Sequence, residues 1–235
     1  MARLARLALP GLAHYLWQRG HNGSAIVHDD EDRAALLQVM REAARGSGVQ
    51  LHAYSIGPDG WRALATPETD GAISRMVQAL GRRYVARFNR RHARTGALWD
   101  GRFRCAPVEP GLARLQAMCD IDGRGLAPDL HAGATGIIGS GAHRTGGARD
   151  AALVDPPEYW ALGNTPFERE SRYRQQLDDG LPADAADRLD RAVRGAWAFG
   201  SPAFLTDLAE RARRPVQPRP RGRPPNDPTG PAIRD

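Results

Sequence analysis

The residues best suited to bind a charged partner lie together in the stretch 78–104. This stretch holds eight arginines and a single acid, Asp100, and aromatic residues are interleaved with the arginines. An arginine guanidinium pairs bidentately with a phosphate, and an aromatic ring can stack on a base. The stretch therefore predicts a nucleic-acid-binding surface, whose residues are Arg82, Arg83, Tyr84, Arg87, Arg90, Arg91, His92, Arg94, Trp99, Arg102 and Arg104.

A helix is expected to position most of these arginines. Val77, Leu80, Tyr84 and Phe88 recur at steps of three and four residues, so a helix that begins near Ile73 would bury that stripe. Most of the arginines would then lie on the opposite side and face the partner. In the alternative interpretation, this is a solvated basic helix whose aromatic residues belong to the core.

A second basic segment forms the end of the chain. Residues 211–235 contain seven arginines against two aspartates, and residues 214–235 have too few apolar side chains to pack, so we expect a disordered tail. Within it, Arg221, Gly222 and Arg223 stand between prolines and are similar to an AT-hook. The glycine would let the backbone approach the floor of a narrow A·T minor groove while the arginines enter it. The alternative is a solubilising tail.

Composition limits the other classes of function. The formal charge is +6 over 235 residues, and every Lys+Arg cation is an arginine. Cys105 and Cys119 are the only cysteines and lack the spacing of a zinc site, so we expect free thiols. The first apolar run is interrupted by Pro10, His14 and Gln18, which argues against a signal peptide or a membrane span. These features predict a cytoplasmic protein without a membrane partner.

The elements expected in residues 1–122 follow the order strand, helix, strand, strand, helix, strand, helix. The first helix begins at a cap on Asp29 or Asp30 and ends at Gly46 or Gly48. This order suits an α+β fold, a ferredoxin-like antiparallel sheet with helices on one face. The expected strands are 12–18, 49–56, 61–67 and 103–110, and the last helix is 111–121.

The rest of the chain differs in composition. Residues 123–164 are rich in glycine and show no apolar periodicity, which predicts a flexible linker. Residues 165–213 predict a helical segment with two helices separated at 200–202, the second capped by Ser201 or Gly200. The helices could form a helix-turn-helix DNA reader or a hairpin packed on the first domain.

Several motifs together resemble those of one family. They are PGLAHYLWQRGHNG at 10–23, HDDEDR at 28–33, LHAYSIGPD at 51–59, RRYVARFNRRHARTGALWDGRF at 82–103, and the later GSPAF and RGRPP. In these motifs the chain resembles the REP-associated single-tyrosine HUH transposases. The resemblance implies a ferredoxin-like domain that cuts and rejoins single-stranded DNA at hairpins. Two histidines would hold a divalent metal such as magnesium, and a helix tyrosine would attack the phosphate.

The chain departs from this family where the chemistry is done. The expected Asn-His-hydrophobic-His motif falls on Asp59, Gly60, Trp61 and Arg62, so both histidines are missing. Asp120 occupies the position expected for the nucleophilic tyrosine. We therefore assign no catalytic residue, no metal ligand and no cofactor to this chain.

These observations predict a degenerate transposase that binds hairpin or single-stranded DNA without cleaving it. One alternative is an active transposase with replacement residues, for which His52, Asp59 and Asp120 are candidate metal ligands. Another is a non-functional remnant or an interaction protein. The resemblance leaves homodimer formation open.

Overall fold

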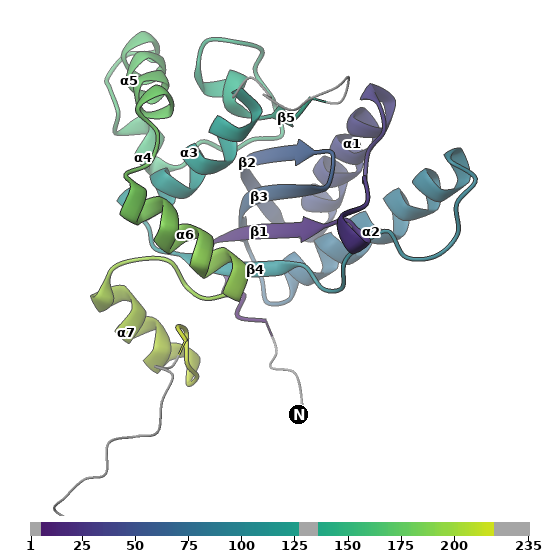
Figure 1. The fold of residues 1–235 in the computed structure, drawn as a ribbon. Coiled ribbons are helices and arrows are strands. Elements are labelled where there is room, and N and C mark those ends of the chain that lie inside the picture. Colours follow the sequence, from purple (N-terminus) through teal and green to yellow (C-terminus); the bar gives the residue numbers. More distant parts are fainter. Residues whose placement is uncertain (1–5, 127–135, 219–235) are drawn as a thin grey trace, which may run out of the picture.

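The computed structural model describes residues 6–126 and 136–218 (Figure 1). The strands are β1 (Ala13–Arg19), β2 (Val49–Gly57), β3 (Gly60–Pro67), β4 (Arg104–Val108) and β5 (Ile138–Gly139). The helices are α1 (Asp30–Ser47), α2 (Ala72–Arg91), α3 (Leu112–Leu126), α4 (Pro157–Trp160), α5 (Pro166–Asp179), α6 (Ala183–Gly195) and α7 (Pro202–Ala212). Two 3-10 turns are η1 (His21–Gly23) and η2 (Gly141–Arg144).

The strands form one antiparallel sheet in the order β4-β1-β3-β2-β5. The first four strands and the helices α1 and α2 follow the β-α-β-β-α-β order of a ferredoxin-like fold. Strands β2 and β3 form the predicted hairpin, and Gly57 pairs with Gly60 at its end. The predicted α+β class and antiparallel sheet are confirmed.

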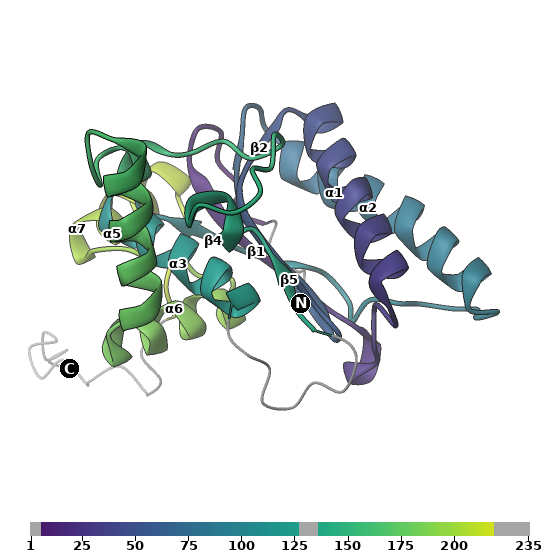
Figure 2. The same cartoon turned by 90° about the horizontal axis from the view of Figure 1, so that it is seen from above.

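Helices cover both faces of the sheet, rather than the one face that was predicted (Figure 2). Helices α1 and α2 pack on one face, α3 and α6 pack on the other, and α5 packs against α3. The reason lies in the strands, since both alternating sets of side chains include large apolar residues. In β1, Leu16 joins the core under α1 and α2, while Tyr15 joins the core under α3.

The local signals in α1 and α2 specify these helices well. The side chain of Asp29 accepts a hydrogen bond from the amide of Asp32, and Gly48 ends α1 with a φ of +66°. The apolar stripe of α2 that includes Leu80, Tyr84 and Phe88 is buried, as its spacing predicts. The interpretation of these aromatic residues as part of the core is therefore correct.

The described part of the 123–164 region is packed, which corrects the prediction of a flexible linker there. It contains the end of α3, β5, η2 and α4, and its Arg144 side chain is fully buried. Arg144 forms ion pairs with Asp122 on α3 and with Asp155, and it donates a hydrogen bond to the carbonyl oxygen of His52. Buried charges need such partners, and here they hold the segment against the sheet.

The helical segment contains three helices instead of the two expected. Ser201 caps α7, as predicted, by accepting a hydrogen bond from the amide of Phe204. Leu189 and Val193 of α6 are buried in the core on the α3 side of the sheet. This segment therefore packs on the first domain and agrees with the hairpin interpretation more than with a free DNA reader.

Segments from later in the chain pair with both edges of the four strands β4-β1-β3-β2. Strand β5 pairs with β2 through Ser55 and Ile56. At the opposite edge, Val108 of β4 forms a bridge with Phe199, and the amide of Glu109 donates to the carbonyl oxygen of Phe199. No described helix combines the length and apolar character that crossing a membrane requires.

Candidate nucleic-acid interface

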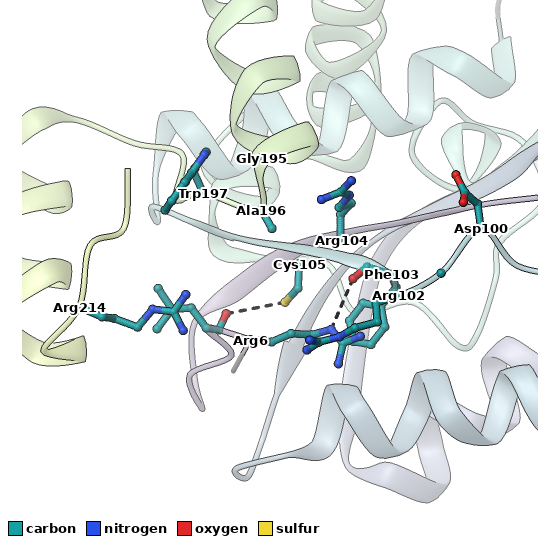
Figure 3. A pocket seen from close by; sticks show the side chains of 12 residues that line it. Arg6, Asp100, Arg102, Phe103, Arg104, Cys105, Gly195, Ala196, Trp197 and Arg214 are labelled. Carbon is teal, nitrogen blue, oxygen red and sulfur yellow. Dashed lines mark hydrogen bonds between the residues drawn. The ribbon is translucent and has the colours of Figure 1, made fainter. Parts of the chain in front are cut away.

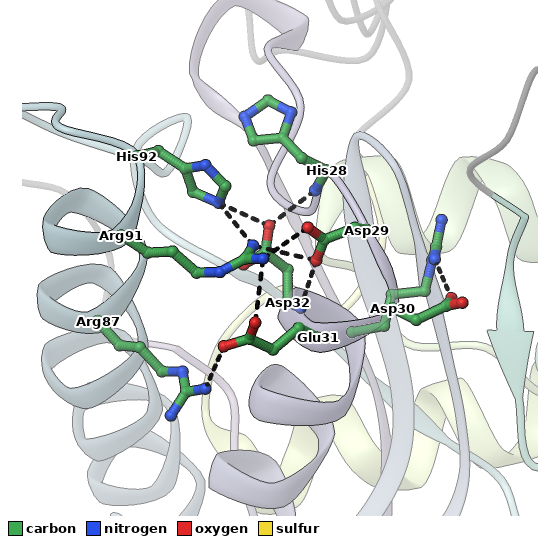
Figure 4. Close-up of polar contacts among 9 residues, drawn as sticks. His28, Asp29, Asp30, Glu31, Asp32, Arg87, Arg91 and His92 are labelled. Atoms are coloured by element: carbon green, nitrogen blue, oxygen red, sulfur yellow. Dashed lines mark hydrogen bonds and ion pairs between the residues drawn. The ribbon is translucent and has the colours of Figure 1, made fainter.

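The basic face of α2 lies against acidic residues of α1 (Figure 4). Arg83 pairs with Glu42, and Arg87 donates to Glu31 over 3.0 Å. These arginines were predicted to form a nucleic-acid surface, but their charges are already matched within the protein. Such exposed pairs remain open to competition by phosphate, because each contributes little free energy.

Arg91 and His92 form the most densely paired part of this contact. Arg91 contacts Asp29 over 2.7 Å and Asp32 over 2.8 Å, and His92 lies 2.8 Å from the second oxygen of Asp32. The hydrogen bond from Arg91 lowers the pKa of Asp29 to about 2, with help from the amide of Asp32. Arg91 and His92 are thus the predicted contact residues that are most fully engaged inside the protein.

The remaining predicted residues of this stretch have different environments. Arg82 and Arg90 are exposed and form no ion pair with the described residues. Arg94 is partly buried and lies over the Phe88 ring. Tyr84 cannot stack on a base in this structure, because it is fully buried and its hydroxyl donates to the carbonyl oxygen of Ile26.

The predicted minor-groove residues Arg221, Gly222 and Arg223 lie outside the described residues, as does most of the predicted disordered tail. The predicted linker also falls outside them over 127–135.

A row of basic and aromatic side chains crosses the face of the sheet beneath α3 and α6. Trp17 of β1 pairs with Arg104 of β4 on one side and with Arg62 of β3 on the other. Directly opposed residues of neighbouring strands project from the same face of a sheet. The indole of Trp17 is therefore flanked by two guanidinium groups, one of which, Arg62, lies 5.1 Å from the ring centre.

Further arginines surround the same indole. Arg194 of α6 lies 5.6 Å from the ring centre of Trp17, and Arg19 lies 5.9 Å from it. Arg102 and Arg104 line the adjoining cavity of about 180 Å³ together with Trp17. Arg194 pairs with Asp190. The other arginines form no ion pair with an acid in the described part of the chain; they are Arg19, Arg62, Arg102 and Arg104. We call Trp17, Arg19, Arg62, Arg102, Arg104 and Arg194 the Trp17 groove.

The inner end of the groove contains a tyrosine and a carboxylate. Tyr15 donates a hydrogen bond of 2.6 Å to Asp120 of α3, and Arg124 pairs with the same carboxylate over 3.0 Å. Burial and the nearby Asp120 charge raise the pKa of Tyr15 well above its usual value. These three side chains line a cavity of about 230 Å³ with Trp17 and Arg62. The side chains of β1, β3 and α3 therefore meet in one place.

Comparison with known proteins finds one matching family model. Residues 13–116 match the family model described as transposase IS200 like. This segment is therefore similar to the IS200-like transposases. No curated protein matches the chain.

Two solved structures are similar to part of this chain. One is a REP-associated tyrosine transposase bound to a REP hairpin, with 14% identity, a TM-score of 0.43, and coverage of 52% of this chain and 71% of the other. The second is a putative transposase from Deinococcus radiodurans R1, with 21% identity, a TM-score of 0.36, and coverage of 46% and 88%.

The residues at this site do not fit the divalent metal that the resemblance to the transposases implies. Arg62, which stands where the motif resemblance expects a metal-binding histidine, brings a positive charge to the cavity that also contains Asp120. The replacement ligand His52 is occupied elsewhere, since its ring nitrogens contact the carbonyl oxygen of Val154 and the hydroxyl of Thr66. Within residues 6–126 and 136–218, no group of three or more His, Cys, Asp or Glu side chains is arranged to hold a metal.

Trp17, Arg19 and Arg194 were not among the predicted site residues. A signal was present in β1, where Tyr15, Trp17 and Arg19 alternate and so share one face of a strand. Arg194 carried no such signal, because its place beside Trp17 depends on how α6 packs on the sheet.

Replacing Glu31 and Glu42 by glutamine is expected to raise the affinity for DNA about two- to fivefold. The two changes would release Arg87 and Arg83 to contact phosphates, and each released cation strengthens the salt dependence of binding. Fluorescence anisotropy with a labelled single-stranded hairpin, at two salt concentrations, measures both quantities. The matched control neutralises the exposed acids Asp178 and Glu210, which lie away from α2. An unchanged affinity in the first variant would show that the α2 face does not meet DNA.

Proposed function

We propose that this chain, which is similar to the IS200-like transposases, binds hairpin or single-stranded DNA through the Trp17 groove and does not cleave it. The observation that carries the proposal is the row formed by Arg62, Trp17 and Arg104 across three neighbouring strands. Guanidinium groups on both sides of a partly exposed indole suit a DNA strand, whose phosphates alternate with stackable bases.

The form of DNA follows from the aromatic contact. A base can stack on Trp17 only where it is unpaired, as in a single strand or at the loop or foot of a hairpin. The exposed Arg82 and Arg90 of α2 would add contacts with phosphates. The tail would add weak minor-groove contacts through Arg221, Gly222 and Arg223, whose effective concentration is raised by the covalent tether.

The absence of cleavage is proposed from the residues at the inner end of the groove. Arg62 would repel the cation that polarises a scissile phosphate in the family, and Asp120 carries no hydroxyl with which to form a phosphotyrosine link. Arg62 instead offers a direct counter-charge to a phosphate. This part of the groove is therefore suited to hold a strand without reacting with it.

One observation favours the alternative of strand cleavage with replacement residues. Tyr15 is the tyrosine at this site, and its hydroxyl donates to Asp120, which could accept the phenol proton. Against this alternative, Tyr15 is 1% exposed and its pKa is raised, so its phenolate is disfavoured. Tyr15 is nevertheless the residue to change in a test of cleavage.

The test incubates the protein with labelled single-stranded hairpin DNA and magnesium or manganese, after a native gel shift has shown binding. Binding that weakens with salt, without a nick or a covalent band on a denaturing gel, is the expected result. A covalent band that disappears in the Tyr15→Phe variant would establish cleavage instead. Absence of salt-sensitive binding would overturn the proposal, and a noncooperative melting curve would favour the remnant interpretation. A chain ending at residue 218 tests the tail, whose loss is expected to weaken binding to A·T-rich DNA.

A further inference from the structure

A larger cavity lies beside the Trp17 groove, between β4 and the segments that come before and after the family match (Figure 3). Its volume is about 460 Å³, which falls in the roughly 300–1,000 Å³ range of small-molecule sites. Arg6 contributes from the N-terminal segment, and Gly195, Trp197 and Arg214 contribute from the C-terminal segment. Because these residues lie outside 13–116, the cavity belongs to the whole chain rather than to the matched segment.

The charge of this cavity is strongly unbalanced. Arg6, Arg102 and Arg104 line it, and Asp100 is the single acid among the lining residues. Arg6 lies 3.8 Å above the Phe103 ring. Burial and the neighbouring charge of Arg102 lower the pKa of Arg6, so these two cations repel each other. Neither of them forms an ion pair with an acid in the part of the chain that the structure describes. An anion in the cavity would relieve this repulsion.

The C-terminal wall of the cavity supplies an aromatic side chain. Trp197 is partly buried and lies against Gly195, where an added Cβ would fall 2.1 Å from the indole. The absence of a side chain at Gly195 therefore allows the indole to take this position. A planar, partly exposed indole in the same cavity as several arginines is suited to a ligand with both a phosphate and a base.

We propose that this cavity binds one nucleotide unit, with its phosphate between Arg6 and Arg102 and its base against Trp197. The phosphate can come from a free nucleotide or from a nucleotide of a bound DNA strand. The shared lining residues Arg102 and Arg104 join the cavity to the Trp17 groove. A strand held in the groove would therefore reach this cavity without leaving the protein surface, which is the arm of the proposal that rests on the proposed function.

The experiment uses the full chain and titrates dAMP, inorganic phosphate and a short single-stranded oligonucleotide by calorimetry. The variants are Arg6→Gln and Trp197→Leu, which leave the Trp17 groove intact, and Trp197→Phe, which keeps an aromatic ring. We expect dAMP to bind more tightly than phosphate. We also expect Arg6→Gln and Trp197→Leu each to weaken dAMP binding about tenfold, with most of the affinity kept in Trp197→Phe. Arg45→Ala, which removes an exposed charge outside both sites, is the control.

Each outcome separates this proposal from the proposed function. Loss of dAMP affinity in both variants identifies a site for free nucleotides, even if hairpin DNA does not bind. If dAMP fails to bind but oligonucleotide affinity falls in both variants, the ligand is a nucleotide of the strand. If both variants bind dAMP and the oligonucleotide as the unchanged chain does, the cavity proposal is wrong, while binding through the Trp17 groove can still stand.

Discussion

Replacing Arg144 by alanine is expected to lower the free energy of unfolding by about 3–5 kcal/mol. The Arg144 side chain is fully buried between Asp122 and Asp155, so its removal would leave buried carboxylates without their cation. Burial already raises the pKa of Asp122, although Arg144 and the hydroxyls of Ser140 and Tyr173 oppose the shift. Chemical denaturation followed by far-UV circular dichroism measures the change.

The matched control for this variant is Arg211→Ala. Arg211 also pairs with an aspartate, but both side chains of that pair are more than half exposed. We expect the control to change the free energy of unfolding by less than about 1 kcal/mol. An equally small effect of Arg144→Ala would contradict the view that the buried pairs hold residues 136–155 against α3.

The double variant Arg62→Ala/Arg104→Ala is expected to weaken binding of hairpin DNA about 10- to 100-fold at low salt. Each replacement would remove one charge-assisted contact with a phosphate, on either side of Trp17. The slope of log affinity against log salt concentration should also fall, by about 0.7 for each contact with a single strand. Fluorescence anisotropy over a range of salt concentrations determines both values.

The control for this variant is Arg45→Ala/Arg211→Ala, which removes the same net charge from exposed positions outside the groove. It should weaken binding less than threefold. If the two double variants lose affinity equally, the effect comes from net charge alone, and the Trp17 groove is not the DNA site. Circular dichroism of both variants establishes that the fold is unchanged.

The first domain was predictable because its signals are local. Asp29 caps the start of α1 and Gly48 ends it. The apolar stripe through Leu80, Tyr84 and Phe88 orients α2 against the sheet. The alternation in the strands similarly fixed which side chains share a face. Each of these signals depends on residues within one element, and packing then confirms what the local pattern specifies.

The environment of the arginines in α2 was not predictable in the same way. The pattern indicated that Arg83, Arg87 and Arg91 would leave the core, which is correct. It did not indicate that Glu31 and Glu42 would meet them, because these acids are 41 to 56 residues away along the chain. Only the packing of α1 beside α2 brings opposite charges together.

The packing of the Gly-rich region around Arg144 could not be predicted either, for a different reason. Apolar periodicity is absent around Arg144 because its neighbours are held by ion pairs and hydrogen bonds instead of by an apolar stripe. Asp122, Asp155 and Arg144 are spread over 34 residues of sequence, so no short window contains the complete set. The glycine-rich composition therefore suggested a flexible linker, whereas the tertiary structure buries Arg144.

Strands β2 and β4 are paired by segments that come later in the chain, and this order has a consequence for synthesis on the ribosome. A nascent chain that ends before Ile138 has formed neither the pairing of β5 with β2 nor the bridge between Val108 and Phe199. Unpaired strand edges readily recruit other strands. During this interval the emerging domain has two unpaired strand edges. We therefore expect it to need chaperones most before residue 199 leaves the exit tunnel.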